Sequence, residues 1–195
     1  YWKRAAAKAG LSAATSAVCC YPQDDGWIAA QADLVRAAYD KAAKAGKPRI
    51  LFSAHGLPKK VIAGGDPYQW QVEQTAAAVV AHLAIPGLDW AICYQSRVGP
   101  LEWIGPSTEE EIARGGADRV PLVITPIAFV SEHSETLVEL DIEYSERAHH
   151  AGVPAFERVP AVATHPAFIA GLANLVRASS APIAPGGNGK RLCPA

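Results

Sequence analysis

The sequence contains no methionine, not even at position 1, and it opens on the helix-like stretch YWKRAAAKAG. A chain that starts inside a helix indicates a fragment or a processed product, so we expect a partner segment that is missing here. An excess of charge of either sign is also lacking, because the chain contains 18 Lys and Arg residues and 19 Asp and Glu residues. This balance argues against a nucleic-acid-binding surface and against a disordered polyelectrolyte.

Long hydrophobic runs are missing as well. The stretch VPLVITPIAFV, residues 120–130, is too short to span a bilayer, and no charged leader precedes an apolar segment at the start. We therefore expect a soluble, cytoplasmic protein. Half of the residues are hydrophobic, which suffices for one domain with a substantial core.

Cysteine is scarce and its spacing is uninformative. Cys19, Cys20, Cys93 and Cys193 show no C-x-x-C pattern, so we do not expect a disulfide framework. The first three are interpreted as small buried residues in or beside strands.

What the sequence does contain is an alternation of short apolar runs with longer helical stretches. Pro154 and Pro160 restrict the last apolar run to a short edge strand. We expect Ser107 or Thr108 to cap a helix that begins with glutamates. The expected strands are 12–21, 48–56, 88–95, 119–127 and 153–161, and the expected helices are about 1–9, 26–46, 68–84, 106–116, 131–146 and 165–179.

Near-continuous apolar strands that alternate with helices predict an α/β fold, a parallel sheet flanked by helices on both faces in a Rossmann-like three-layer arrangement. We expect one domain at residues 1–178 and a flexible tail rich in proline and glycine at 179–195. Ligands of such sheets bind beyond the carboxyl ends of the strands, where loops converge. The loops after three strands carry His55, Trp103, His133 and Glu135, which we expect to share one crevice.

The stretch SEHSETLVELDIEYSE, residues 131–146, concentrates acids on one expected helix without any Lys or Arg. At about 100° per residue its five glutamates fall within about 80°, between apolar flanks, one of which contains Leu140 and Tyr144. Like-charged i,i+4 pairs cost roughly 0.2–0.5 kcal/mol each, and Glu143 with Arg147 forms the favourable pair. A solvated face and a functional stripe both remain open. A functional stripe would pass protons or weakly hold a divalent metal.

Five motifs then follow one another in the order seen in one family: LFSAHGLP, GDPY, CYQSRVGPLEWIGPST, PIAFVSEHSETLVELDIEY and ATHPAFIAGLANLV. The sequence resembles the ferrochelatases, which insert ferrous iron into protoporphyrin, over nearly all of residues 1–179. The resemblance implies a chelatase-like fold of two similar α/β domains with the porphyrin between them. This chain resembles the C-terminal domain, so the missing N-terminal domain is an expected partner.

The resemblance also implies roles for single residues. It makes His55 the residue that accepts pyrrole protons or helps to deliver iron, and it places Glu135 opposite, at the start of a row on a helix with a π-type turn. The implied metal contacts are His55, Glu135, Glu139 and Glu143, and the implied porphyrin contacts are Trp103, His133, Phe129 and Tyr94.

The implied substrates are Fe2+ and protoporphyrin IX, and the implied product is haem b. A histidine near neutrality is a suitable base for pyrrole protons. Some ferrochelatases carry a [2Fe-2S] cluster, which normally needs four thiolates. Since the tail offers Cys193 alone, we expect no cluster in this chain.

Two other functions fit the same residues. One is a chelatase for another tetrapyrrole or metal, because carboxylates do not distinguish ferrous iron from cobalt or zinc. The other is a non-catalytic porphyrin-binding module, which would keep Trp103 but would not need His55 together with Glu135. The sequence leaves open the route of iron, the oligomeric state and a peripheral membrane contact, and we expect this chain alone to be inactive.

Overall fold

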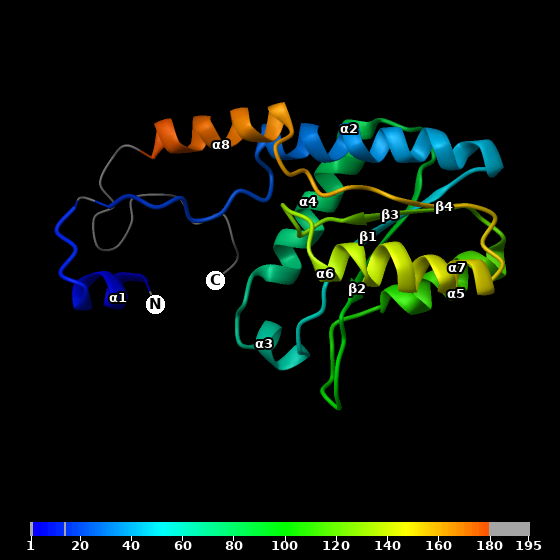
Figure 1. The fold of residues 1–195 in the computed structure, drawn as a ribbon, viewed down its shortest axis with the longest axis horizontal. Coiled ribbons are helices and arrows are strands. Elements are labelled where there is room, and N and C mark those ends of the chain that lie inside the picture. Colours follow the sequence, from blue (N-terminus) through cyan, green and yellow to red (C-terminus); the bar gives the residue numbers. More distant parts are fainter. Residues whose placement is uncertain (1, 14, 180–195) are drawn as a thin grey trace.

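The computed structural model describes residues 2–13 and 15–179 (Figure 1). The expected tail, with Cys193, therefore lies outside the described residues, except for Ser179.

A four-stranded sheet forms the centre of the fold. Its strands are β1 (Arg49–His55), β2 (Asp89–Gln95), β3 (Leu122–Pro126) and β4 (Phe156–Arg158), in the spatial order β2-β1-β3-β4. All three strand pairs are parallel, and β4 lies at an edge, as Pro154 and Pro160 predict. In the register of β1 and β2, His55 stands opposite Gln95.

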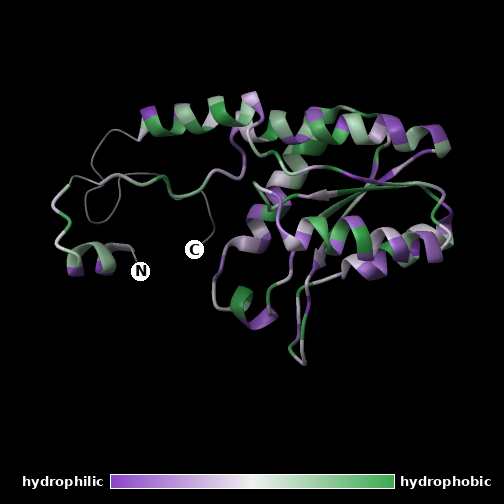
Figure 2. Cartoon of the chain, viewed as in Figure 1, coloured by the Kyte–Doolittle hydropathy of each residue, from purple (hydrophilic) through white to green (hydrophobic). Residues whose placement is uncertain are grey.

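Helices cover both faces of this sheet, which confirms the expected α/β fold (Figure 1). On one face Phe52 and Ala54 pack in a core formed with three helices, and on the other face Leu51 and Cys93 pack against the acidic segment. In Figure 2 the flanking helices are coloured in alternating apolar and polar bands, as expected of helices with one buried side. The first face carries α2 (Asp25–Ala42), α4 (Tyr68–Leu83) and α8 (Pro166–Ala178), and the second carries α5 (Thr108–Asp118), α6 (Ser134–Leu137), the π-helical segment η2 (Glu139–Glu143) and α7 (Tyr144–His150).

Side-chain caps explain where two helices begin. Asp24 caps α2 by accepting a hydrogen bond from the Trp27 N–H at 3.0 Å. Ser107, one of the two expected residues, caps α5 in a reciprocal arrangement with Glu110. Short helices are also present at η1 (Ala43–Ala45), α3 (Lys59–Ala63) and α1 (Trp2–Lys8). Within the described residues no helix is both long and apolar enough to cross a membrane.

The expected strand at 12–21 is wrong. The described part of that segment contains no strand and links α1, which lies apart from the sheet, to α2 (Figure 1). Its Ser and Ala side chains offer little apolar area to bury, so a place in the sheet would contribute little stability. Cys19 is accordingly exposed and Cys20 half-buried, whereas Cys93 is buried in β2 as expected.

Candidate functional site

The loops that follow the strands meet at one edge of the sheet, as expected. Backbone hydrogen bonds join the loop after β1 to the end of β2 and to the loop that follows it: Gly56 N–H donates to the Gln95 carbonyl at 2.8 Å, and the Leu57 carbonyl accepts from the Ile104 N–H at 3.0 Å. The segment after β3 is joined to the end of β2, because the Gln95 side chain donates to the Glu135 carbonyl at 2.9 Å.

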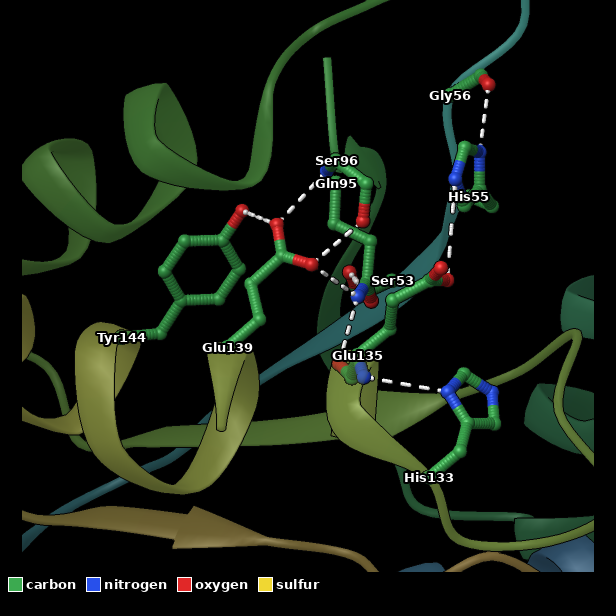
Figure 3. Close-up of polar contacts among 9 residues, drawn as sticks. All are labelled: Ser53, His55, Gly56, Gln95, Ser96, His133, Glu135, Glu139 and Tyr144. Atoms are coloured by element: carbon green, nitrogen blue, oxygen red, sulfur yellow. Dashed lines mark hydrogen bonds and ion pairs between the residues drawn. The ribbon is translucent and has the colours of Figure 1, made fainter. Parts of the chain in front are cut away.

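His55 and Glu135 face each other at this edge (Figure 3). His55 Nε2 lies 3.8 Å from Glu135 Oε2, and each side chain is 39% exposed. The pair is therefore close enough to share a proton or a cation and open enough to meet a ligand.

A hydrogen bond fixes the protonation pattern of the His55 ring. Nδ1 lies 2.8 Å from the carbonyl oxygen of Gly56, which can only accept, so Nδ1 carries the proton. The neutral ring then has its lone pair on Nε2, directed towards Glu135. Two acceptors thus face each other, and a proton or a metal ion between them would satisfy both.

His133 and Phe129 lie beside this pair. His133 caps α6, because its Nδ1 accepts the Glu135 N–H at 3.2 Å. In the neutral ring the proton is then on Nε2, which leaves that N–H available to a ligand. The ring centroids of His133 and Phe129 are 4.8 Å apart, so the two side chains form one half-buried wall.

Glu139 is held by four donors (Figure 3). Its Oε1 accepts from the Ser96 N–H and the Tyr144 hydroxyl, both at 2.8 Å. Its Oε2 accepts from Gln95 Nε2 at 3.0 Å and from the Ser96 hydroxyl. A carboxylate offers about four acceptor positions, and here all four are used. Burial is the larger cause and the hydrogen bond to Glu139 the second cause of a raised pKa of Tyr144, so the phenol keeps its proton and donates a hydrogen bond to Glu139.

The π-type turn is confirmed, and it changes the expected helix face. The backbone N–H of Glu143 and of Tyr144 each bond five residues back, to Val138 and Glu139. Residues five apart therefore come together. This geometry brings Tyr144 to Glu139, although the regular projection placed Tyr144 on an apolar flank. Glu143 is exposed, beyond the held carboxylate of Glu139.

Glu132 does not belong to the acidic row, contrary to the projection. It precedes the cap of α6 and binds the Arg158 guanidinium and the Ala161 N–H, each at 2.8 Å. Burial alone would raise the pKa of Glu132, but hydrogen bonds from Thr136, Arg158 and Ala161 outweigh it, and the pKa is lowered.

The expected pairing of Arg147 is also corrected. Arg147 pairs with Glu109 of α5 at 3.4 Å instead of with Glu143. The segment between 131 and 146 lacks basic residues, but Arg158 of β4 binds Glu132 and Asp141 and so neutralises part of its charge.

Two expected porphyrin contacts lie apart from the central pair. Trp103 forms a backbone bridge with Pro58 and packs beside Gly56, so it is on the loop side of His55. Tyr94 is buried in the core on the opposite face of the sheet, because side chains alternate along β2. Burial raises the pKa of Tyr94.

A cavity of about 230 Å3 adjoins the site on the face that carries α4. Tyr68, Trp27 and Ile127 are among its lining residues. The Tyr68 phenol hydrogen-bonds to the backbone of His55, and burial raises its pKa to about 12. Tyr68, from the motif GDPY, is thus joined to the site although the spacing of the strands did not single it out.

Within the described ranges, no three His, Cys, Asp or Glu side chains are grouped as a metal site. Cys93 is no substitute ligand, since burial raises the pKa of its thiol to about 12. The pair His55 and Glu135 supplies one nitrogen and carboxylate oxygens, a donor set suited to passing a divalent ion on.

Gln95, Ser96 and Tyr144 are the site residues that sequence reasoning missed. Gln95 ends β2 and Ser96 follows it, at the edge where ligands are expected, which is a usable signal. Tyr144 had no such signal, because its approach to Glu139 depends on the π turn.

The structure of SirB from Bacillus subtilis with Fe3+ is similar over 76% of this chain and 54% of that chain, at 15% identity and a TM-score of 0.48. A ferrochelatase of Caulobacter vibrioides (strain NA1000 / CB15N) is 55% identical over 91% of this chain and 50% of its own length. A ferrochelatase of Phenylobacterium zucineum (strain HLK1) is 49% identical over 100% of this chain and 55% of its own length.

The chain therefore spans about half the length of the curated relatives it matches. The family model named Ferrochelatase matches residues 1–180. Since this match covers most of the chain and the motifs around His55 and Glu135 lie within it, the chain belongs to the ferrochelatase family.

Proposed function

We propose that the protein to which this chain belongs inserts Fe2+ into protoporphyrin IX to form haem b, with residues 1–178 as its C-terminal domain. The observation that carries the proposal is the pair formed by His55 Nε2 and Glu135 Oε2 at 3.8 Å. The ferrochelatase relatives support the reaction, and their greater length supports a second domain.

In the proposed reaction the chain's own residues move the protons. Metallation releases two pyrrole protons. His55 Nε2 accepts them one after the other and passes each to the Glu135 carboxylate, while Nδ1 keeps its bond to the Gly56 carbonyl. The resulting imidazolium is stabilised by the Glu135 carboxylate, as expected for opposite charges at this distance. The row from Glu135 past Glu139 to the exposed Glu143 then leads protons out or iron in.

His133, Phe129 and Trp103 provide porphyrin contacts in this proposal. His133 and Phe129 form a wall next to Glu135, and Trp103 lies next to the residue that follows His55. A macrocycle bound over the His55–Glu135 pair would meet both the His133–Phe129 wall and Trp103. Tyr94, being buried on the other face, would support β2 beneath this surface and not touch the ring.

The experiment is metal insertion by the full-length protein carrying His55→Ala or Glu135→Ala. Each variant should lose at least about 100-fold in turnover, because general acid–base groups contribute about that much or more, while porphyrin fluorescence titration still shows binding. His149→Ala and Glu146→Ala, at exposed positions of α7, are matched controls. Near-normal turnover in either site variant contradicts the assigned roles.

The same assay separates the alternatives. One imidazole nitrogen with carboxylate oxygens also suits Co2+ and Zn2+, so parallel rates with the three ions decide the metal. If the unmodified full-length protein binds porphyrin but inserts no metal, it is a porphyrin-binding module instead.

A further inference from the structure

The side chain of Gln95 connects the two sides of the site. Gln95 ends β2 directly opposite His55 in the sheet register and is 1% exposed. Its Nε2 donates both to the backbone carbonyl of Glu135 at 2.9 Å and to Glu139 Oε2 at 3.0 Å (Figure 3). One buried amide thus joins the strand next to His55 to the segment that carries Glu135.

A hydrogen bond to the oxygen of that amide fixes its orientation. The Ser53 hydroxyl donates to Gln95 Oε1 at 2.9 Å, and it lies 2.9 Å from the Thr108 hydroxyl of α5. An amide oxygen can only accept and an amide nitrogen can only donate. With the oxygen turned to Ser53, both N–H groups point to the acidic segment.

Glu139 and Glu135 differ in whether their carboxylate oxygens have acceptor positions open to a ligand. Gln95, Ser96 and Tyr144 fill the four acceptor positions of Glu139. In this arrangement it has no open position for a metal ion. Glu135 Oε2, in contrast, is turned to His55 and to the open side of the site.

We propose that Gln95 is a positioning residue for metal insertion: it sets the separation of His55 and Glu135 and holds Glu139 as a fixed anion. The proposal rests on the proposed function and deepens it, since it removes Glu139 from the groups that bind the transferred ion. The loss of Gln95 should then lower kcat much more than it changes the KM for porphyrin, because the wall of His133 and Phe129 is untouched.

The first test is Gln95→Leu in the full-length protein. We expect kcat for iron insertion to fall about 10- to 100-fold, as for other residues that orient reacting groups, with the KM for porphyrin changed by less than about threefold. Gln31→Leu is the matched control: Gln31 is also 1% exposed and loses a bond to Thr125, but it lies on α2 across the sheet. The control should keep kcat within about twofold.

The second test uses Gln95→Glu, which keeps the shape of the side chain but replaces the donating amide nitrogen with a carboxylate oxygen. Near neutral pH the new carboxylate would face the acceptors of Glu135 and Glu139, and the rate should be low. On protonation its O–H can donate to Glu139, so the rate relative to the unmodified protein should rise as the pH falls. A residue that only fills space would give a flat ratio.

Other groups that titrate nearby are His55 of β1, Cys93 of β2, Glu135 of α6, Glu139 of η2, Tyr144 of α7, and Glu109 and Glu111 of α5. Those in contact with residue 95 titrate together with the new carboxylate. The deciding observation is therefore the direction of the change in the ratio with pH.

The outcomes distinguish the two proposals. If the unmodified full-length protein inserts no metal, the proposed function fails. If it is active but Gln95→Leu matches Gln31→Leu, or Gln95→Glu shows a flat ratio, Gln95 is not a positioning residue. Should Gln95→Leu fail to fold, as judged by circular dichroism, the isosteric Gln95→Glu alone decides.

Discussion

One of the donors to the Glu139 carboxylate, the Tyr144 hydroxyl, can be removed by a substitution that leaves the backbone unchanged. Tyr144 contributes the phenol that binds Oε1 at 2.8 Å, and its ring is packed with Leu140 and Ile112 in the smaller core cluster. A phenylalanine there would keep the packing and lose the hydrogen bond. The two contributions can therefore be measured separately.

Tyr144→Phe should lower the free energy of unfolding by roughly 1.5–3 kcal/mol, the usual worth of a hydrogen bond to a charged acceptor. Urea unfolding of the folded protein measures the change. Tyr39→Phe, on α2 at the opposite face of the sheet, is the control for loss of a phenol. Equal stability of the two variants would show that the Tyr144 bond contributes nothing net.

At the scale of residues, the sequence predicted the centre of the site but not its support. His55 and Glu135 were placed by the rule that loops after parallel strands converge, together with the family motifs. Gln95 could not be assigned a role, because its two bonds depend on how closely the acidic segment packs on β2. Such packing is set by the tertiary structure and not by spacing along the chain.

Among the elements, the acidic segment is the one whose local geometry departed most from expectation. A regular helix would have put Glu132 in line with Glu135 and Tyr144 away from Glu139. In the structure Glu132 precedes the His133 cap and so lies outside the helix, and the π turn brings Tyr144 towards Glu139. The four strands and the longer helices were predictable because apolar runs and helix breakers mark them directly, whereas the short helix α3 was not expected. The small residues of 12–21 resembled a strand without offering a surface to bury.

Glu132 ties this segment to the edge of the sheet, and its contribution to stability should depend on pH. Its pKa in the folded protein lies below the ordinary value of 4.5 because Thr136, Arg158 and Ala161 hydrogen-bond the ionised form. A lowered pKa means that the stabilisation is complete above about pH 4.5 and is lost as the pH falls through the folded-state pKa.

Glu132→Gln should therefore be less stable than the unmodified protein at pH 7, by about 1–3 kcal/mol, and the gap should narrow below about pH 4.5. Urea midpoints at pH 7 and near pH 3.5 give both values. Glu146→Gln, at an exposed position of α7, corrects for the loss of one carboxylate. A gap that stays constant with pH would mean that Arg158 does not stabilise the ionised carboxyl.

For the whole molecule, the open side of the site is the feature with the largest consequence. His55 and Glu135 are each 39% exposed, and Leu137, Val138 and Ile142 of the acidic segment are exposed apolar residues. Water at the pair would compete with the proton transfer, since exclusion of solvent is what strengthens electrostatic interactions in a site. The ferrochelatase relatives are about twice as long as this chain, and in the proposed function the second domain would cover this side.

The isolated 195-residue chain should accordingly insert no measurable iron into protoporphyrin, whereas the full-length protein should be active. Circular dichroism and a cooperative urea transition must first show that the isolated chain is folded. The full-length protein with His55→Ala then gives the background rate, against which the isolated chain is compared. Turnover by the isolated chain clearly above that background would mean that the residues around His55 and Glu135 suffice by themselves, and that a second domain affects binding but not the chemistry.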